Sequence, residues 1–126
     1  MTQILVAPEI ETGKKIVQAL DDAKLKIDVA MWAVLVEYGD WRLILASRRL
    51  AAKDMREAYS TLHEALDKAG FTIRQTSSIM ILGMKDKFIR ELRREFGKTD
   101  DAEGMRLGGY TFADRHIEDA YVYRIS

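Results

Sequence analysis

Residues 27–47 constrain the fold more than any other part of the chain. Two apolar runs, IDVAMWAVLV and WRLILAS, flank the short polar stretch EYGD. With a turn at residues 38–40, strand alternation places on one face Trp32, Val34, Val36, Trp41, Leu43 and Leu45. The opposite face then carries Met31, Ala33, Leu35, Ile44 and Ala46, with Arg42 among them. A hairpin that is apolar on both faces has to be covered twice, by helices or by another chain.

The composition is that of one folded domain over residues 1–126. Hydrophobic residues make up 48% of the chain, which argues against disorder. Cysteine is absent, so disulfides, thiolate catalysis and Cys-ligated zinc are excluded. The 20 basic residues balance 20 acidic ones, so no overall field attracts polyanions. Because the sequence has neither a membrane-length apolar stretch nor a signal peptide, we expect a cytoplasmic protein.

Helical periodicity predicts three helices around the hairpin. The first spans residues 8–23, and the second spans residues 51–69 with a stripe from Met55 through Tyr59, Leu62 and Leu66. The third spans residues 86–96, with Asp86 as its N-cap and Gly97 as its stop. Residues 71–73 are expected to be extended and residues 75–78 to form a loop.

Further strands are predicted on both sides of the third helix. Residues 79–82 suit an interior strand, and residues 105–107 and 110–112 suit two strands joined by a turn at Gly108-Gly109. The final strand, residues 120–125, places Tyr121, Tyr123 and Ile125 on one face by strict alternation. We therefore expect an α+β fold: a single mixed, largely antiparallel sheet built on a central β-hairpin, with two or three packing helices.

The tail IEDAYVYRI, taken together with WRLILAS after the aromatic hairpin, resembles a family of small uncharacterised bacterial proteins. The resemblance covers most of the chain. It implies a compact stand-alone domain, and it assigns no activity and no catalytic residue.

Five acidic residues are the main candidates for enzyme chemistry: Asp28, Glu37, Asp40, Glu118 and Asp119. If they converge at the strand ends they suit Mg²⁺ and phosphodiester cleavage, because hard cations prefer oxygen ligands. Strict alternation puts Asp119 on the face of Ile117, Tyr121 and Tyr123. The acidic-x-Lys pair of restriction-type nucleases is absent, and turn or edge-strand roles are the alternative.

Histidine and glycine patterns give two further candidates. His116 is placed to form an acid–base couple with Glu118 or Asp119, although a structural role is favoured. The junction between strand 79–82 and helix 86–96 offers backbone amides beside Lys85 and Lys87 for an anion, in competition with Asp86. Neither pattern predicts a cofactor or a metal site.

Basic residues form two clusters despite the neutral total. One surrounds Arg48 and Arg49, and the other follows the third helix through Arg90, Arg93 and Arg94. They indicate either a surface for nucleic acid or solvated helix faces.

The sequence thus favours a non-enzymatic binding or protein-interaction domain that forms a homodimer through apolar hairpin residues or binds a protein partner. The alternatives are a metal-dependent phosphoester hydrolase and a nucleic-acid-binding protein.

Overall fold

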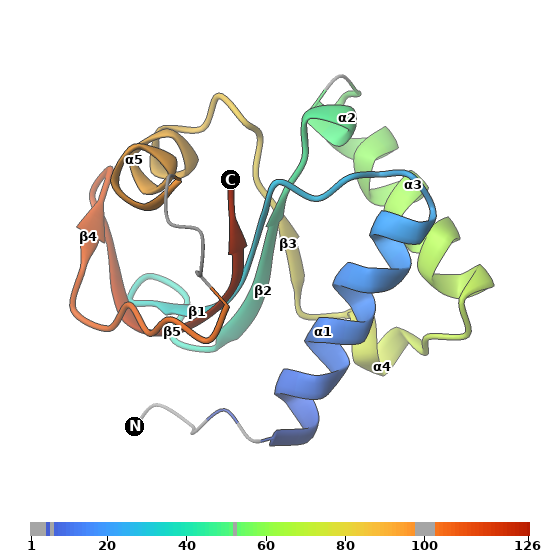
Figure 1. The fold of residues 1–126 in the computed structure, drawn as a ribbon, viewed down its shortest axis with the longest axis horizontal. Helices are drawn as coiled ribbons and strands as arrows, with labels where there is room; N and C mark the ends of the chain where they lie inside the picture. Colours follow the sequence, from blue (N-terminus) through green and yellow to red (C-terminus); the bar gives the residue numbers. More distant parts are fainter. Residues whose placement is uncertain (1–4, 6, 52, 98–102) are drawn as a thin grey trace.

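The computed structural model describes residues 5, 7–51, 53–97 and 103–126. Within them, a five-stranded sheet of order β3-β2-β1-β5-β4 has α1 and α3 on one face and α5 on the other (Figure 1). The elements are α1 (Ala7–Asp22), β1 (Val29–Leu35), β2 (Trp41–Ala46), α2 (Arg48–Ala51), α3 (Met55–Lys68), α4 (Ile73–Thr76), β3 (Ile79–Ile81), α5 (Lys87–Phe96), β4 (Thr111–Phe112) and β5 (Arg115–Ile125). The predicted α+β fold with a mixed sheet is confirmed.

The central hairpin has the two faces that alternation predicted, although the segment that joins its strands runs from residue 36 to residue 40. β1 and β2 are antiparallel, with Trp32 opposite Leu43 and Val34 opposite Trp41. Every residue of β1 is buried, and in β2 only Arg42 is partly exposed. The two faces contribute to separate cores, one with both tryptophans and one with Met31 and Ile44, as alternation predicted. Val36 departs from the prediction, because β1 ends at Leu35 and Val36 lies 55% exposed in the turn.

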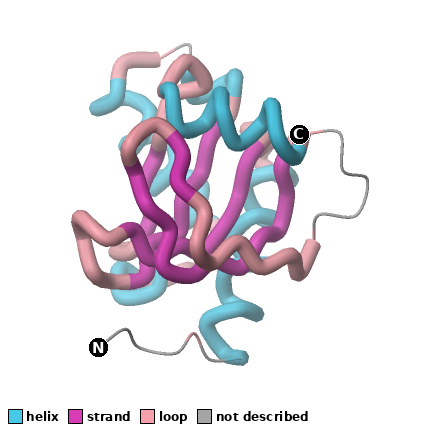
Figure 2. Tube along the Cα trace, turned by 90° about the vertical axis from the view of Figure 1, so that its left-hand side faces the viewer, coloured by secondary structure: helices cyan, strands magenta, loops and turns pink. Residues whose placement is uncertain are grey.

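Helices of the same chain cover both faces of the hairpin. On the face that carries the tryptophans lie the buried residues of α1 and α3: Gly13, Ile16, Val17, Leu20, Ala58, Leu62 and Leu66. On the other face lie Phe88, Ile89 and Leu92 of α5, which crosses in front of the strands in Figure 2. Of the two covers that the sequence left open, helices of the same chain are the one observed on both faces of the hairpin.

The second predicted helix begins later than its apolar pattern indicated. Asp54 is the N-cap of α3 and accepts a hydrogen bond from the Glu57 amide, which separates α3 from the short α2. Met55 is consequently 48% exposed rather than part of the buried stripe. Residues 71–73 are not an extended piece either, because Thr72 and Gln75 form a capping box that begins α4.

The β3 strand lies at one edge of the sheet and not in its interior. It pairs with β2 in parallel, with Leu43 opposite Ile79 and Leu45 opposite Ile81. The hydroxyl of Tyr59, on α3, accepts a hydrogen bond from the Ile81 amide at 2.8 Å. The backbone of β3 is thus hydrogen-bonded both to β2 and to a side chain of α3.

The β5 strand is longer than predicted and is interrupted by two irregularities. Its register against β1 shifts between Ala30 and Met31 and again between Val34 and Leu35. Each shift reverses the alternation of the side chains. Tyr121 and Tyr123 therefore pack on the tryptophan side, whereas Ile125 and Ile117 belong to the core beneath α5. The predicted common face of Tyr121, Tyr123 and Ile125 is wrong for Ile125, and the placement of Asp119 beside Ile117 is wrong for the same reason.

Gly108-Gly109 does form a turn, as predicted, but the segments on its two sides both pair with β5 and not with each other. Arg106 makes an isolated antiparallel bridge to Tyr121, and the turn between β4 and β5 consists of Ala113 and Asp114, with φ of 50° and 67°. The Glu91 carboxylate accepts a hydrogen bond from the Ala113 amide at 2.6 Å, which holds this left-handed turn against α5. None of the described helices has both the length and the apolar character needed to cross a membrane.

Candidate functional site

The structure does not bring the five candidate carboxylates together. Asp28 immediately precedes β1, at the end of the sheet where Val29 lies opposite Ile125. Glu37 and Asp40 lie in the hairpin turn at the other end of β1, near which Asp119 pairs with Val34. Among the described residues, no group of three His, Asp or Glu side chains is arranged to hold a metal ion.

Most of these carboxylates have arginine partners on the surface. Asp40 lies 3.1 Å from Arg42, Glu37 lies 3.3 Å from Arg115, and Asp119 lies 2.8 Å from Arg106. Glu118 is exposed on β5, between Ile117 and Asp119.

His116 is also exposed, and its Nδ1 lies 2.8 Å from the Thr111 hydroxyl. Asp119 accepts hydrogen bonds from Arg106 and from the Ala120 amide, so it is paired with these groups and not with His116.

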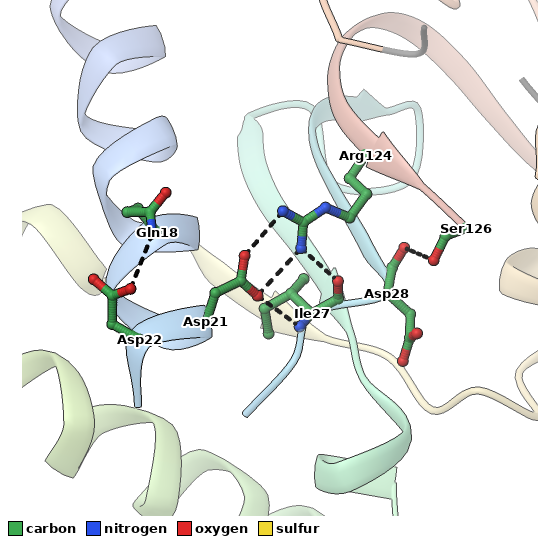
Figure 3. A network of polar contacts seen from close by, with 7 residues as sticks. All are labelled: Gln18, Asp21, Asp22, Ile27, Asp28, Arg124 and Ser126. Carbon is green, nitrogen blue, oxygen red and sulfur yellow. Dashed lines mark hydrogen bonds and ion pairs between the residues drawn. The ribbon is translucent and has the colours of Figure 1, made fainter. Parts of the chain in front are cut away.

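Asp28 has a structural environment of its own. It is buried, and its Oδ2 accepts a hydrogen bond from the Arg48 amide at 2.8 Å, while the Ser47 hydroxyl accepts from the next two amides of α2. The main-chain oxygen of Asp28 accepts hydrogen bonds from the Ser126 amide and hydroxyl (Figure 3). Asp28 therefore joins the end of β5 to the start of α2.

A second polar network fixes the loop between α1 and β1 (Figure 3). Arg124 lies 2.9 Å from Asp21 and donates to the Ile27 carbonyl, and Asp21 accepts from the Ile27 amide. Burial raises the pKa of Asp21, but the Arg124 hydrogen bond, the Ile27 amide and the Arg124 charge together hold it below its usual value. No sequence motif indicated this pairing, because Asp21 and Arg124 lie at opposite ends of the chain.

The basic clusters lie toward the same end of the sheet, although α2 and α5 are not among the element pairs that pack closely in the described part of the chain. Because β2 and β3 are parallel neighbours, their carboxyl ends lie at the same end of the sheet. The β2 strand is followed by α2, and the β3 strand is followed by the loop to α5. Both α2 and this loop lie at the upper end of the sheet in Figure 1. We call this surface the basic end, and it consists of Arg48, Arg49, Lys85, Lys87, Arg90 and Arg94.

The side chains of the basic end are exposed to solvent. All six are exposed, and none takes part in the ion pairs found among the described residues. Three acidic residues near this end have backbone partners: Asp28 accepts a hydrogen bond from the Arg48 amide, and Asp54 and Asp86 are the N-caps of α3 and α5. Asp86 accepts from the Phe88 amide, so its carboxylate competes with an anion for the first turn of α5, and the Lys85 and Lys87 side chains are the cationic groups at this junction.

Arg93 differs from the other arginines of α5. It is only partly exposed, and its Nε donates to the Ser126 carbonyl at 2.6 Å. This bond joins α5 to Ser126, whose amide and hydroxyl donate to the main-chain oxygen of Asp28.

A separate hollow of about 420 Å³ lies between α3 and α4. Its walls are formed by His63, Glu64, Leu66, Asp67, Phe71, Ile73 and Thr76. It contains none of the residues that the sequence singled out as site candidates.

No protein-family model, no curated protein and no solved structure matches the chain. The resemblance to small bacterial proteins therefore stays a prediction, and the geometry of the chain itself is the basis for assigning a function.

Proposed function

We propose that the chain is a non-enzymatic binding domain whose ligand is an anionic polymer held at the basic end. The observation that carries the proposal is that Arg48 and Arg49 follow β2 at the same end of the sheet at which β3 leads through Lys85 and Lys87 into α5. Clustered cations on one surface attract a polyanion even when the net charge is zero, because the interaction is local and decays over about 10 Å at 0.1 M salt.

The arrangement of the acidic residues supports binding over hydrolysis. A metal-dependent phosphoester hydrolase needs at least two carboxylates directed at one cation. Here Asp28 is engaged with the Arg48 amide, and Asp40 and Asp119 are engaged with different arginines. These partners give each of the three carboxylates a structural role.

Self-association stays a prediction, as does a cytoplasmic location. Apart from Val36 in the turn, the apolar hairpin residues are buried within one chain, so a homodimer or another protein partner would have to use a different surface. Among the described residues, the exposed large hydrophobic side chains are Val36, Tyr38, Met55, Ile73 and Tyr110.

Immobilised heparin, a sulfated polyanion, tests the proposal. We expect the chain to be retained and the double variant Arg48→Glu/Arg90→Glu to elute at much lower salt. The matched control is Lys15→Glu/Arg74→Glu, which changes the charge equally at two exposed residues outside the basic end, neither of them ion-paired among the described residues. Failure of the wild-type chain to bind, or equal losses in the two variants, would overturn the proposal.

A further inference from the structure

The outward face of α5 carries a line of three cationic side chains. Lys87, Arg90 and Arg94 are spaced by three and four residues, so they share one side of the helix. All three are exposed, whereas the opposite side is the buried one, with Phe88, Ile89 and Leu92. We call this line the α5 stripe.

The two acids of α5 do not interrupt the stripe. Glu91 accepts a hydrogen bond from the Ala113 amide in the β4–β5 turn, so its carboxylate is directed at the protein. Glu95 follows Arg94 by one residue and is therefore rotated by about 100° away from it.

Three contacts hold the helix that presents the stripe. Asp86 caps its first turn, Glu91 joins its middle to the β4–β5 turn, and Arg93 joins its last turn to Ser126. The helix also buries its apolar side in the core beneath the sheet. The stripe is thus fixed to a rigid layer, and binding requires ordering of the Lys and Arg side chains only.

We infer that the polymer is a nucleic acid whose phosphate backbone lies along the α5 stripe, an inference that rests on the proposed function. With a rise of 1.5 Å per residue, Lys87 and Arg94 are about 10 Å apart along the helix axis. That length equals about three base-pair rises of 3.4 Å measured along the duplex axis, so the stripe spans only a few neighbouring phosphates. Arginine suits this ligand, because the planar guanidinium binds phosphate oxygens in a bidentate manner.

The lack of exposed apolar groups on α5 favours a nucleic acid over other anionic surfaces. None of its residues is among the exposed large hydrophobic side chains of the described chain. An acidic protein partner usually needs buried aromatic or aliphatic anchors, and a membrane surface needs apolar groups to insert. Contacts from the stripe to phosphates carry no sequence information, so binding should depend little on base sequence.

Fluorescence anisotropy tests this inference with four labelled probes. These are two duplex DNAs of about 20 base pairs and unrelated sequence, a single-stranded RNA, and a polyglutamate peptide. We expect nucleic acid to bind, with the two duplexes within about threefold of each other, and polyglutamate to bind weakly. The double variant Arg90→Ala/Arg94→Ala should reduce duplex affinity by at least tenfold and lower the slope of log affinity against log salt by about 2, since each phosphate contact contributes about 0.9.

The variant Lys15→Ala/Arg74→Ala is the charge-matched control and should bind like the wild type, with circular dichroism confirming that both variants fold. Retention on heparin without nucleic-acid binding, or preference for polyglutamate, would overturn the inference and leave the proposed function standing. An unchanged salt slope in Arg90→Ala/Arg94→Ala would also overturn it. Failure of every polyanion to bind would overturn both.

Discussion

The buried carboxylate of Asp28 accepts a hydrogen bond from the backbone amide of Arg48 at 2.8 Å. Two residues separated by the whole β1–β2 hairpin are thereby joined at the first turn of α2. The contact places Arg48 at the basic end and satisfies an amide that has no partner within its own helix. Asp28 thus has the role of a positioning residue for α2.

Replacing Asp28 by alanine should destabilise the fold. The Arg48 amide loses its acceptor, and an unsatisfied buried donor costs about 1–3 kcal/mol. Urea denaturation of Asp28→Ala should show a loss of free energy of unfolding in this range. The matched control is Asp40→Ala, which breaks an exposed ion pair with Arg42 and should cost less than about 1 kcal/mol. Equal losses in the two variants would contradict the structural role of Asp28.

Gly13 should not tolerate alanine, although alanine is the better helix former by about 1 kcal/mol. A β-carbon at this position would lie 2.3 Å from the Tyr123 hydroxyl and 2.5 Å from the Trp32 indole nitrogen. The Tyr123 hydroxyl itself donates to the Ile10 carbonyl, so it cannot retreat without losing that bond. Thermal unfolding of Gly13→Ala should therefore show a lower melting temperature than the wild type.

A double-mutant cycle tests whether the clash with the Tyr123 hydroxyl is the reason why Gly13→Ala lowers the stability. Tyr123→Phe removes the hydroxyl that crowds the new β-carbon, so Gly13→Ala should cost less in a Tyr123→Phe background than in the wild type. Additive effects of the two substitutions would show that the clash with the hydroxyl is not the reason.

The hairpin was predictable because its evidence is local and periodic. Alternation alone placed Trp32 and Trp41 on one face and Met31 and Ile44 on the other, and the observed register agrees. The N-cap role of Asp86 could likewise be predicted from the residues next to it in the sequence. The capping box of Thr72 and Gln75 was also visible in the sequence as a Thr-x-x-Gln spacing and would have predicted α4.

The errors arose where backbone geometry departs from a simple period. Irregularities in β5 reverse its alternation, and no residue type announces them, so Ile125 was assigned to the wrong face. The turn at Ala113-Asp114 uses left-handed residues other than glycine and depends on Glu91, which lies on a different element. The turn predicted at Gly108-Gly109 is also present, but the pairing of its flanking segments with β5 could not be predicted from the glycines.

The candidate site was predictable in its parts but not in its assembly. Arg48, Arg49, Lys85 and Lys87 stand out as basic clusters in the sequence. Their location toward the same end of the sheet depends on β3 lying parallel to β2, a long-range pairing that neither segment encodes alone. The partner of Asp28 was equally hidden, because it is a backbone amide and not a side chain.

Truncation of Trp41 should cost about 3–5 kcal/mol of unfolding free energy, as expected for a buried aromatic side chain. Trp41 is 8% exposed and belongs to the core between the sheet and α1 and α3. Guanidinium denaturation of Trp41→Ala provides the measurement, and Tyr38→Ala in the adjacent turn is the control, because Tyr38 is 40% exposed. A loss below about 1 kcal/mol for Trp41→Ala would contradict the packing.

The Asp21–Arg124 pair should make stability depend on pH in the acidic range. The pKa of Asp21 is lower in the folded chain than in the unfolded chain, so its ionised form stabilises the fold. This contribution is complete above the unfolded value of about 4 and is lost as the pH falls through the folded value. The free energy of unfolding of the wild type should therefore fall more steeply below about pH 4 than that of Asp21→Asn.

Comparison with a surface carboxylate isolates the Asp21 contribution. Glu64 forms an exposed ion pair with Lys68 within α3, so Glu64→Gln should leave the acid slope close to that of the wild type. Arg124→Gln should flatten the slope as Asp21→Asn does, because the guanidinium supplies both the hydrogen bond and the charge that lower the pKa of Asp21. Parallel stability curves for the wild type and Asp21→Asn between pH 2 and pH 6 would show that Asp21 is not the group whose protonation weakens the fold.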